Sequence, residues 1–229
     1  MPGWQSIYYL LVSRPLTEQL NLAMHLTTLN IGGNSYSGVE MDPLLLTKIY
    51  GYGAYLSAAA VILTLLTGIL FFSFGEKFGK LNDLFSVFQV LLMIPLVFLF
   101  NQFMTPPKFL AKLISSIFGL GGILISAYGQ IRLLLGKIDF EGSLKYFPAG
   151  GAIGFWLIMI NLSSLGASEL PRALGWIGIA AGTGYLLTVG GFLKGGQKDP
   201  LFYSGALVLG VCYPIWGFWL GQLILASLK

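Results

Sequence analysis

Charged residues are scarce in this chain, and that scarcity excludes most soluble folds. Only 10% of its 229 residues are charged, whereas 55% are hydrophobic. A soluble domain carries about 25% charged residues, so this sequence cannot supply a soluble surface. The formal net charge is +4, but the basic residues are scattered over short connections rather than gathered in a stripe. This distribution argues against a nucleic-acid partner and favours contact with lipid headgroups.

Residues that carry chemistry are equally rare. Cys212 is the only cysteine and His25 the only histidine, which excludes an intramolecular disulfide, a bis-histidine haem and zinc sites that need two or more histidines. All nine acidic residues lie outside the middles of the long apolar runs, whereas ion-coupled carriers usually need a buried carboxylate there. No GxSxG motif supports a serine nucleophile. We therefore predict no catalytic residues, no metal site and no required cofactor.

Long apolar runs dominate what remains. Each contains about the 20 residues that a helix needs to cross a bilayer, and each is continuous rather than alternating, which favours helices over barrel strands. The sequence therefore predicts an all-α, polytopic transmembrane helical bundle of six spans, with residues 49–229 forming one domain. The six runs cover roughly 49–74, 84–104, 113–135, 148–167, 173–193 and 201–228.

Residues 1–48 differ from the rest and predict an N-terminal amphipathic, interfacial segment. Trp4, Tyr8 and Tyr9 are rings of the kind that settle at the headgroup level, and residues 16–29 read as a short amphipathic helix. Whether residues 1–30 span the membrane or lie on it stays open. Asp42 and Pro43, in turn, resemble the cap and first turn of the helix that enters the first span.

Small residues recur at helical spacing inside the spans and predict close helix packing. One seam on the third span consists of Ser115, Gly119, Gly122, Ser126 and Gly129. A similar seam on the first span consists of Gly53, Ser57, Ala60, Thr64 and Thr67, and the later spans carry the pairs Gly150/Gly154, Gly178/Gly182 and Gly217/Gly221. Pro95 and Pro214 predict kinks in the second and sixth spans.

Polar and aromatic residues within the spans are the candidates for a site. One hypothesis brings five of them together in a polar cavity; the alternative is that such amides bond between helices and that the arginine reaches the headgroups. The five are Gln89, Asn101, Gln130, Arg132 and Asn161. Trp216 and Trp219, which follow Pro214, are candidates to wall a pocket for a flat lipophilic ligand, and His25 is a candidate axial ligand to a pigment.

Basic residues fall on both sides of the predicted membrane. Seven of the 13 lie on one side, so the positive-inside rule separates the two orientations by a single residue and leaves orientation open. The seven are Lys77, Lys80, Arg132, Lys137, Lys145, Lys194 and Lys198.

Residues 170–221 resemble a bacterial family of six-helix integral membrane proteins of unknown function. The resemblance rests on the stretch Leu170–Gly182, on Tyr185–Leu187 and on Ile215–Gly221. It implies a bacterial inner-membrane location and the same fold, but no catalytic residues, because that family has no established activity.

Three functions fit these observations. The first is a non-enzymatic structural or accessory subunit that packs against membrane lipids, other membrane proteins, a second copy of itself or a lipophilic ligand. The alternative is a small permease or facilitator with a central polar cavity. A membrane enzyme that acts on lipid is the third.

Overall fold

The computed structural model describes residues 42–103, 109–165 and 170–228, and these residues are almost entirely helical, with no strand among them. The predicted interfacial helix, His25 and the N-terminal aromatic residues lie outside the described residues. The helices are α3 (Pro43–Phe74), α4 (Gly79–Leu91), α5 (Ile94–Phe103), α6 (Phe109–Leu134), α7 (Phe140–Leu144), α8 (Ala149–Ser164), α9 (Arg172–Gly195) and α10 (Pro200–Ala226), with 3-10 turns η1 (Glu76–Phe78) and η3 (Gly196–Lys198).

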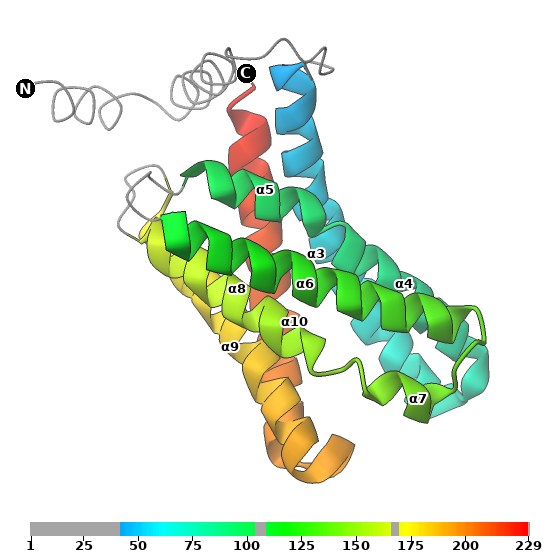
Figure 1. Cartoon of the computed structure of the whole chain (residues 1–229). Coiled ribbons are helices and arrows are strands. Elements are labelled where there is room, and N and C mark those ends of the chain that lie inside the picture. Colours follow the sequence, from blue (N-terminus) through cyan, green and yellow to red (C-terminus); the bar gives the residue numbers. More distant parts are fainter. Residues whose placement is uncertain (1–41, 104–108, 166–169, 229) are drawn as a thin grey trace, which may run out of the picture.

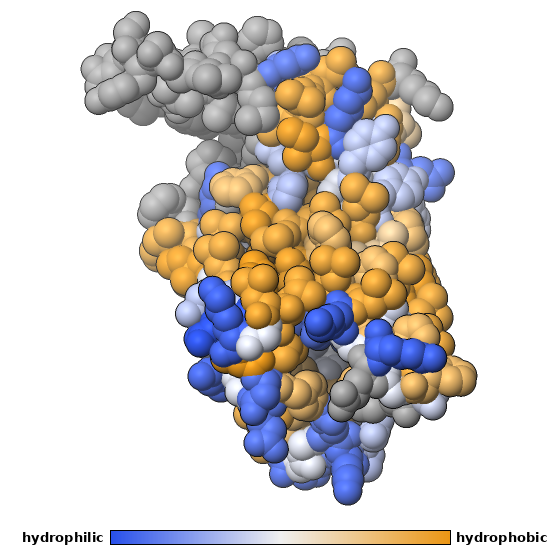
Figure 2. Space-filling view, turned by 90° about the vertical axis from the view of Figure 1, so that its right-hand side faces the viewer, coloured by the Kyte–Doolittle hydropathy of each residue, from blue (hydrophilic) through white to orange (hydrophobic). Residues whose placement is uncertain are grey.

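Six helical segments are long and apolar enough to cross a membrane, so the chain is a multi-pass membrane protein and the predicted fold class is confirmed. In space-filling view, a broad apolar band is bounded below by a hydrophilic end (Figure 2). The six segments of the described residues are Pro43–Phe71, Gly79–Phe100, Leu110–Leu134, Phe140–Ser164, Arg172–Lys198 and Pro200–Ala226.

The six spans form a closed ring in chain order. Each span packs against the spans before and after it, and α10 completes the ring by packing against α3 (Figure 1). The start of α3 and the end of α10 therefore lie side by side, where Leu225 covers Gly51. Short connections make successive helices antiparallel. With an even number of spans, the end of the last span therefore lies on the same side of the membrane as the start of the first.

Side chains fill the middle of this ring. The largest fully buried ones are two tryptophans, a tyrosine and nine aliphatic or methionine residues, contributed by every span except the first. They are Trp156, Trp216, Tyr213, Met93, Leu96, Leu99, Ile123, Ile153, Leu157, Ile160, Leu174 and Leu220.

Four consecutive neighbours in the ring, α8, α9, α10 and α3, touch through glycine and are called the glycine wall here. A β-carbon added at Gly182 of α9 would lie 2.6 Å from the carbonyl oxygen of Gly154 on α8. On α10, one at Gly217 would lie 3.0 Å from the Ala54 carbonyl oxygen, and one at Gly221 2.9 Å from that of Gly51. Because lipid removes most of the hydrophobic drive between helices, such backbone approach replaces it with dispersion contacts.

The seam predicted on the third span also packs as expected. Gly119 and Gly122 of α6 are buried against α8, where added β-carbons would lie 2.8 Å from Trp156 and 3.0 Å from Ile153. Gly129, one of the same seam, lies against Tyr146 with an added β-carbon 2.7 Å from its Cβ.

The second span is divided into α4 and α5, and these two helices, residues 79–103, are called the split span here. The regular ladder is interrupted after Leu91: Met93 N donates to Val90 O at 3.2 Å, and Leu96 N donates to Met93 O at 3.0 Å. Pro95 follows the break and has no N–H to continue the ladder. The predicted kink at Pro95 is thus a break between two helices, whereas α10 continues through Pro214.

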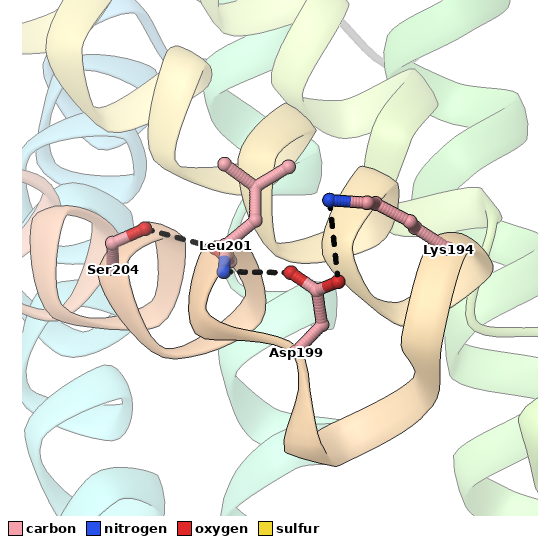
Figure 3. A network of polar contacts seen from close by, with 4 residues as sticks. All are labelled: Lys194, Asp199, Leu201 and Ser204. Carbon is pink, nitrogen blue, oxygen red and sulfur yellow. Dashed lines mark hydrogen bonds and ion pairs between the residues drawn. The ribbon is translucent and has the colours of Figure 1, made fainter.

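Aspartates cap the two longest helices, α3 and α10, at their N-termini. The Asp42 carboxylate accepts a hydrogen bond from Leu44 N at 2.9 Å, so α3 begins at the predicted cap. Asp199 accepts from Leu201 N at 2.8 Å and lies 3.7 Å from Lys194 Nζ, which bends the chain sharply from α9 into α10 (Figure 3). The Lys194 side chain is 74% exposed, so this ion pair adds little to stability, and the Asp199 cap is the main contact of the turn.

Candidate functional site

Three hydrogen bonds between side chains join five helices in the core of the ring, and a fourth, from Thr67 Oγ1 of α3 to Asn82 Oδ1 of α4 at 3.3 Å, joins the first two spans. Their groups are neutral hydroxyl, amide and indole groups, which can donate and accept hydrogen bonds. The three bonds in the core run from Gln89 Nε2 to the Tyr185 hydroxyl (2.7 Å), from the Tyr213 hydroxyl to Ser57 Oγ (3.0 Å) and from Trp216 Nε1 to Asn161 Oδ1 (2.9 Å).

The indole of Trp216 is held on all sides by protein groups. It is fully buried, its N–H donates to Asn161, and Phe100 of α5 stacks on it with ring centroids 6.0 Å apart and planes inclined by 18°. Asn161 is fixed in turn, because its amide nitrogen donates to Leu157 O at 2.8 Å. Gly178 of α9 lies directly against the Asn161 amide and leaves no room for a β-carbon. The tryptophan therefore braces α10 against α8 and α5.

Tyr213 forms the second brace, between α10 and α3. Its hydroxyl contacts Ser57 Oγ, which itself donates to Ala54 O at 3.0 Å, so the chain of bonds ends on backbone. Both side chains are fully buried, and the tyrosine ring packs against Trp216 with centroids 5.6 Å apart. A buried phenol needs such a partner, since an unmet hydroxyl in an apolar medium is costly.

Gln89 and Tyr185 form the third brace, between α4 and α9, which face each other across the ring. The hydroxyl of Tyr185 lies in the hydrophobic core and accepts from the amide of Gln89 three residues before the break at Leu92. Helices α4 and α9 are not adjacent in the ring, so this bond crosses its interior. It is the one side-chain hydrogen bond between the split span and α9 among the described residues.

Two buried hydroxyls have no hydrogen-bond partner among the described residues. They are Thr64 Oγ1 on α3 and Ser115 Oγ on α6, and Ser115 is fully buried. Serine in a helix often donates to the carbonyl four residues earlier, as Ser116 does to Lys112 O at 2.7 Å. The Ser115 hydroxyl makes no such bond. A substitution in an adjacent side chain that offers this hydroxyl an acceptor should therefore stabilise the fold.

Of the five residues predicted to share a polar cavity, four have side chains among the described residues, and the shared cavity itself stays a prediction. Gln89 and Asn161 bond to Tyr185 and Trp216 rather than to each other, and Arg132 lies at the charged end of α6. Gln130 is half-buried on α6. Asn101 lies in α5, and its side chain is outside the described residues. Two of the five thus take the alternative role of amides that bond between helices.

Trp219 is half-buried and packs against the core cluster that includes Trp216. Whether these two tryptophans contact a lipophilic ligand stays a prediction, as does a pigment on His25. The tyrosines at 185 and 213 were not singled out from the sequence. Their position in the sequence could have indicated them, because each lies near the middle of a span, where a phenol must find a partner inside the protein.

No family model, curated protein sequence or solved structure matches this chain. The resemblance of residues 170–221 to a bacterial membrane family stays a prediction.

Proposed function

We propose that this chain is a non-enzymatic structural or accessory subunit of a bacterial inner membrane, which packs against other membrane proteins. One observation carries the proposal. Six polar side chains from five helices form hydrogen bonds with one another in three pairs, and large buried side chains occupy the ring interior around them. Polar groups bonded in this way hold the helices together. The outer surface of the bundle is then the part that can bind another protein.

The face of α6 is the part of that surface best suited to a neighbour. Only 28% of its apolar stretch is buried, the smallest share of the six spans. Large apolar side chains project from it, and in a bilayer such a face contacts either lipid tails or another helix. The exposed residues along α6 are Leu110, Leu113, Ile114, Ile117, Phe118, Leu124, Ile125, Tyr128 and Ile131.

The test is the mass of the full chain taken from its own membranes in polymer-bounded lipid discs, with native mass spectrometry. We expect a specific complex larger than one copy of the chain. Ile117→Trp on α6, where the side chain is 61% exposed, should release the partner by steric overlap. The matched control is Leu207→Trp on α10, which is 69% exposed and should leave the complex intact. A monomer in the wild-type discs contradicts the proposal.

The split span favours a second candidate, a small facilitator. Broken helices recur in transporters, where the freed backbone groups line a site near the middle of the membrane. Here the break at Leu92 lies close to the bond between Gln89 and Tyr185. Solute entry into vesicles that contain the purified chain, measured by osmotic light scattering, tests this candidate. Uptake above that of empty vesicles, lost in Gln89→Leu, would favour it over the accessory role.

A further inference from the structure

We propose that Arg132, Tyr128 and Tyr146 form a binding site for the phosphate of an anionic lipid headgroup, at the end of α6. Arg132 is the last charged residue of the third span and lies one helical turn after Tyr128. Tyr146 reaches the same place from the segment between α7 and α8. The site does not depend on the proposed accessory role, although Tyr128 also belongs to the exposed side of α6 described above.

The two tyrosines hold the guanidinium group in place. Arg132 Nη1 donates to the Tyr146 hydroxyl at 3.2 Å and to the Tyr128 hydroxyl at 3.4 Å, and its Cζ lies 5.4 Å from the centre of the Tyr128 ring. The tyrosine rings pack edge to face, with centroids 5.6 Å apart and planes inclined by 79°. Gly129 makes this possible, because any β-carbon there would meet Tyr146.

The arrangement leaves donors that match a phosphate. Arginine has five N–H donors, and only Nη1 is used, so Nε and Nη2 remain for a two-pronged contact with phosphate oxygens. Each tyrosine hydroxyl accepts from Arg132, and its own hydrogen is therefore available to a third oxygen. Among the described side chains, no carboxylate lies within ion-pair distance of Arg132, so its charge is not neutralised within that part of the protein.

The charges around the site favour an anion only modestly. The ligand therefore needs further contacts, and a lipid supplies them through its acyl chains. Lys145 Nζ lies 5.3 Å from the centre of the Tyr146 ring, and Lys137 follows the end of the helix. Asp139 and Glu141 oppose them, although Asp139 already caps α7 by accepting from Gly142 N at 2.7 Å. A free phosphate would gain little here, whereas a lipid adds the apolar contacts of its chains.

Capping bonds at the C-terminus of α6 reduce its repulsion of an anion. The C-terminus of a helix carries partial negative charge, which repels phosphate. In α6 the carbonyls of Arg132 and Leu133 accept from Lys137 N at 2.8 Å and from Gly136 N at 2.9 Å, in a turn where Gly136 has a φ of 66°. These bonds satisfy two of the exposed carbonyls, as in a Schellman motif.

The experiment measures lipid retained by the full-length protein, in native mass spectrometry from mild detergent, after addition of phosphatidylglycerol or of phosphatidylcholine. We expect preferential retention of phosphatidylglycerol, reduced about tenfold in Arg132→Gln through loss of a charged hydrogen-bond donor. Lys112→Gln removes the same charge near the other end of α6 and should leave retention unchanged. Equal retention of the two lipids, or equal losses in the two variants, overturns the proposal.

Two further measurements separate the alternatives. Tyr146→Phe keeps the charge and the fold but releases the guanidinium group, and we expect about a threefold loss of phosphatidylglycerol; this variant decides the question if Arg132→Gln does not fold, and unchanged retention then overturns the proposal. Excess inorganic phosphate should not displace the lipid. Displacement by inorganic phosphate would assign the site to a soluble phosphate and overturn the lipid assignment.

Discussion

The glycine wall and the split span close the same ring in different ways. In the wall, helices α8, α9, α10 and α3 meet backbone to backbone, as at Gly154 and Gly182, where there is no room for one more carbon. The split span instead packs larger side chains, such as Met93 and Leu96, into the interior and is tied to α9 by one amide–phenol bond. The wall should therefore resist substitution far more strictly than the split span.

The largest effect is expected for Gly182→Ala in the wall. The new β-carbon would overlap a carbonyl oxygen of α8, which cannot rotate away as a side chain can, so we expect a loss of about 3 kcal/mol in the free energy of unfolding. Titration with a denaturing detergent in mixed micelles measures it. The control is Gly121→Ala on α6, where nothing lies within 4 Å, and better helix propensity should leave stability equal or slightly higher. Equal losses in both variants would show that α8 and α9 are not closely packed.

Trp216→Phe should have the next largest effect. It keeps an aromatic ring in the stack with Phe100 but leaves Asn161 Oδ1 without its donor, at a cost of about 2 kcal/mol. The matched control is Trp176→Phe on α9, whose side chain is 60% exposed and should tolerate the change. Unfolding followed by the fluorescence of the remaining tryptophans gives both values. If Trp216→Phe left the free energy of unfolding unchanged, the hydrogen bond from the indole to Asn161 would not form in the membrane.

A smaller effect is expected at the bond between the two regions. A double-mutant cycle with Gln89→Leu and Tyr185→Phe should give a coupling energy of about 0.6 kcal/mol and at most about 1.7 kcal/mol, as for other hydrogen bonds between membrane helices. Mixed-micelle unfolding of the two single variants and the double variant supplies the cycle. Additive losses would remove the link between the split span and α9.

Pro95→Ala is expected to change stability least, by less than about 0.5 kcal/mol. Pro95 is the second residue of α5, where an N–H would have no partner within the helix, so the proline costs little. The same mixed-micelle assay applies. A gain of more than about 1 kcal/mol would instead show that the proline forces a break on a span that favours one continuous helix.

The sequence alone determined the class of structure and much of its packing. Apolar runs of sufficient length give membrane helices whatever surrounds them, because every backbone group must be bonded within its own segment. The same local reasoning placed the cap at Asp42 and the seam at Gly119 and Gly122, since a helix fixes which residues share a face. Pro95 likewise marked the second span as irregular, although not as two helices.

Only the tertiary structure decided which polar groups meet. Gln89 is 96 residues from Tyr185 in sequence, and Ser57 is 156 residues from Tyr213, so no local pattern relates them. Their pairing depends on the ring order of the spans and on the rotation of each helix about its axis. Both are set by how glycine-lined surfaces fit together, and that fit is a property of two helices at once rather than of either sequence.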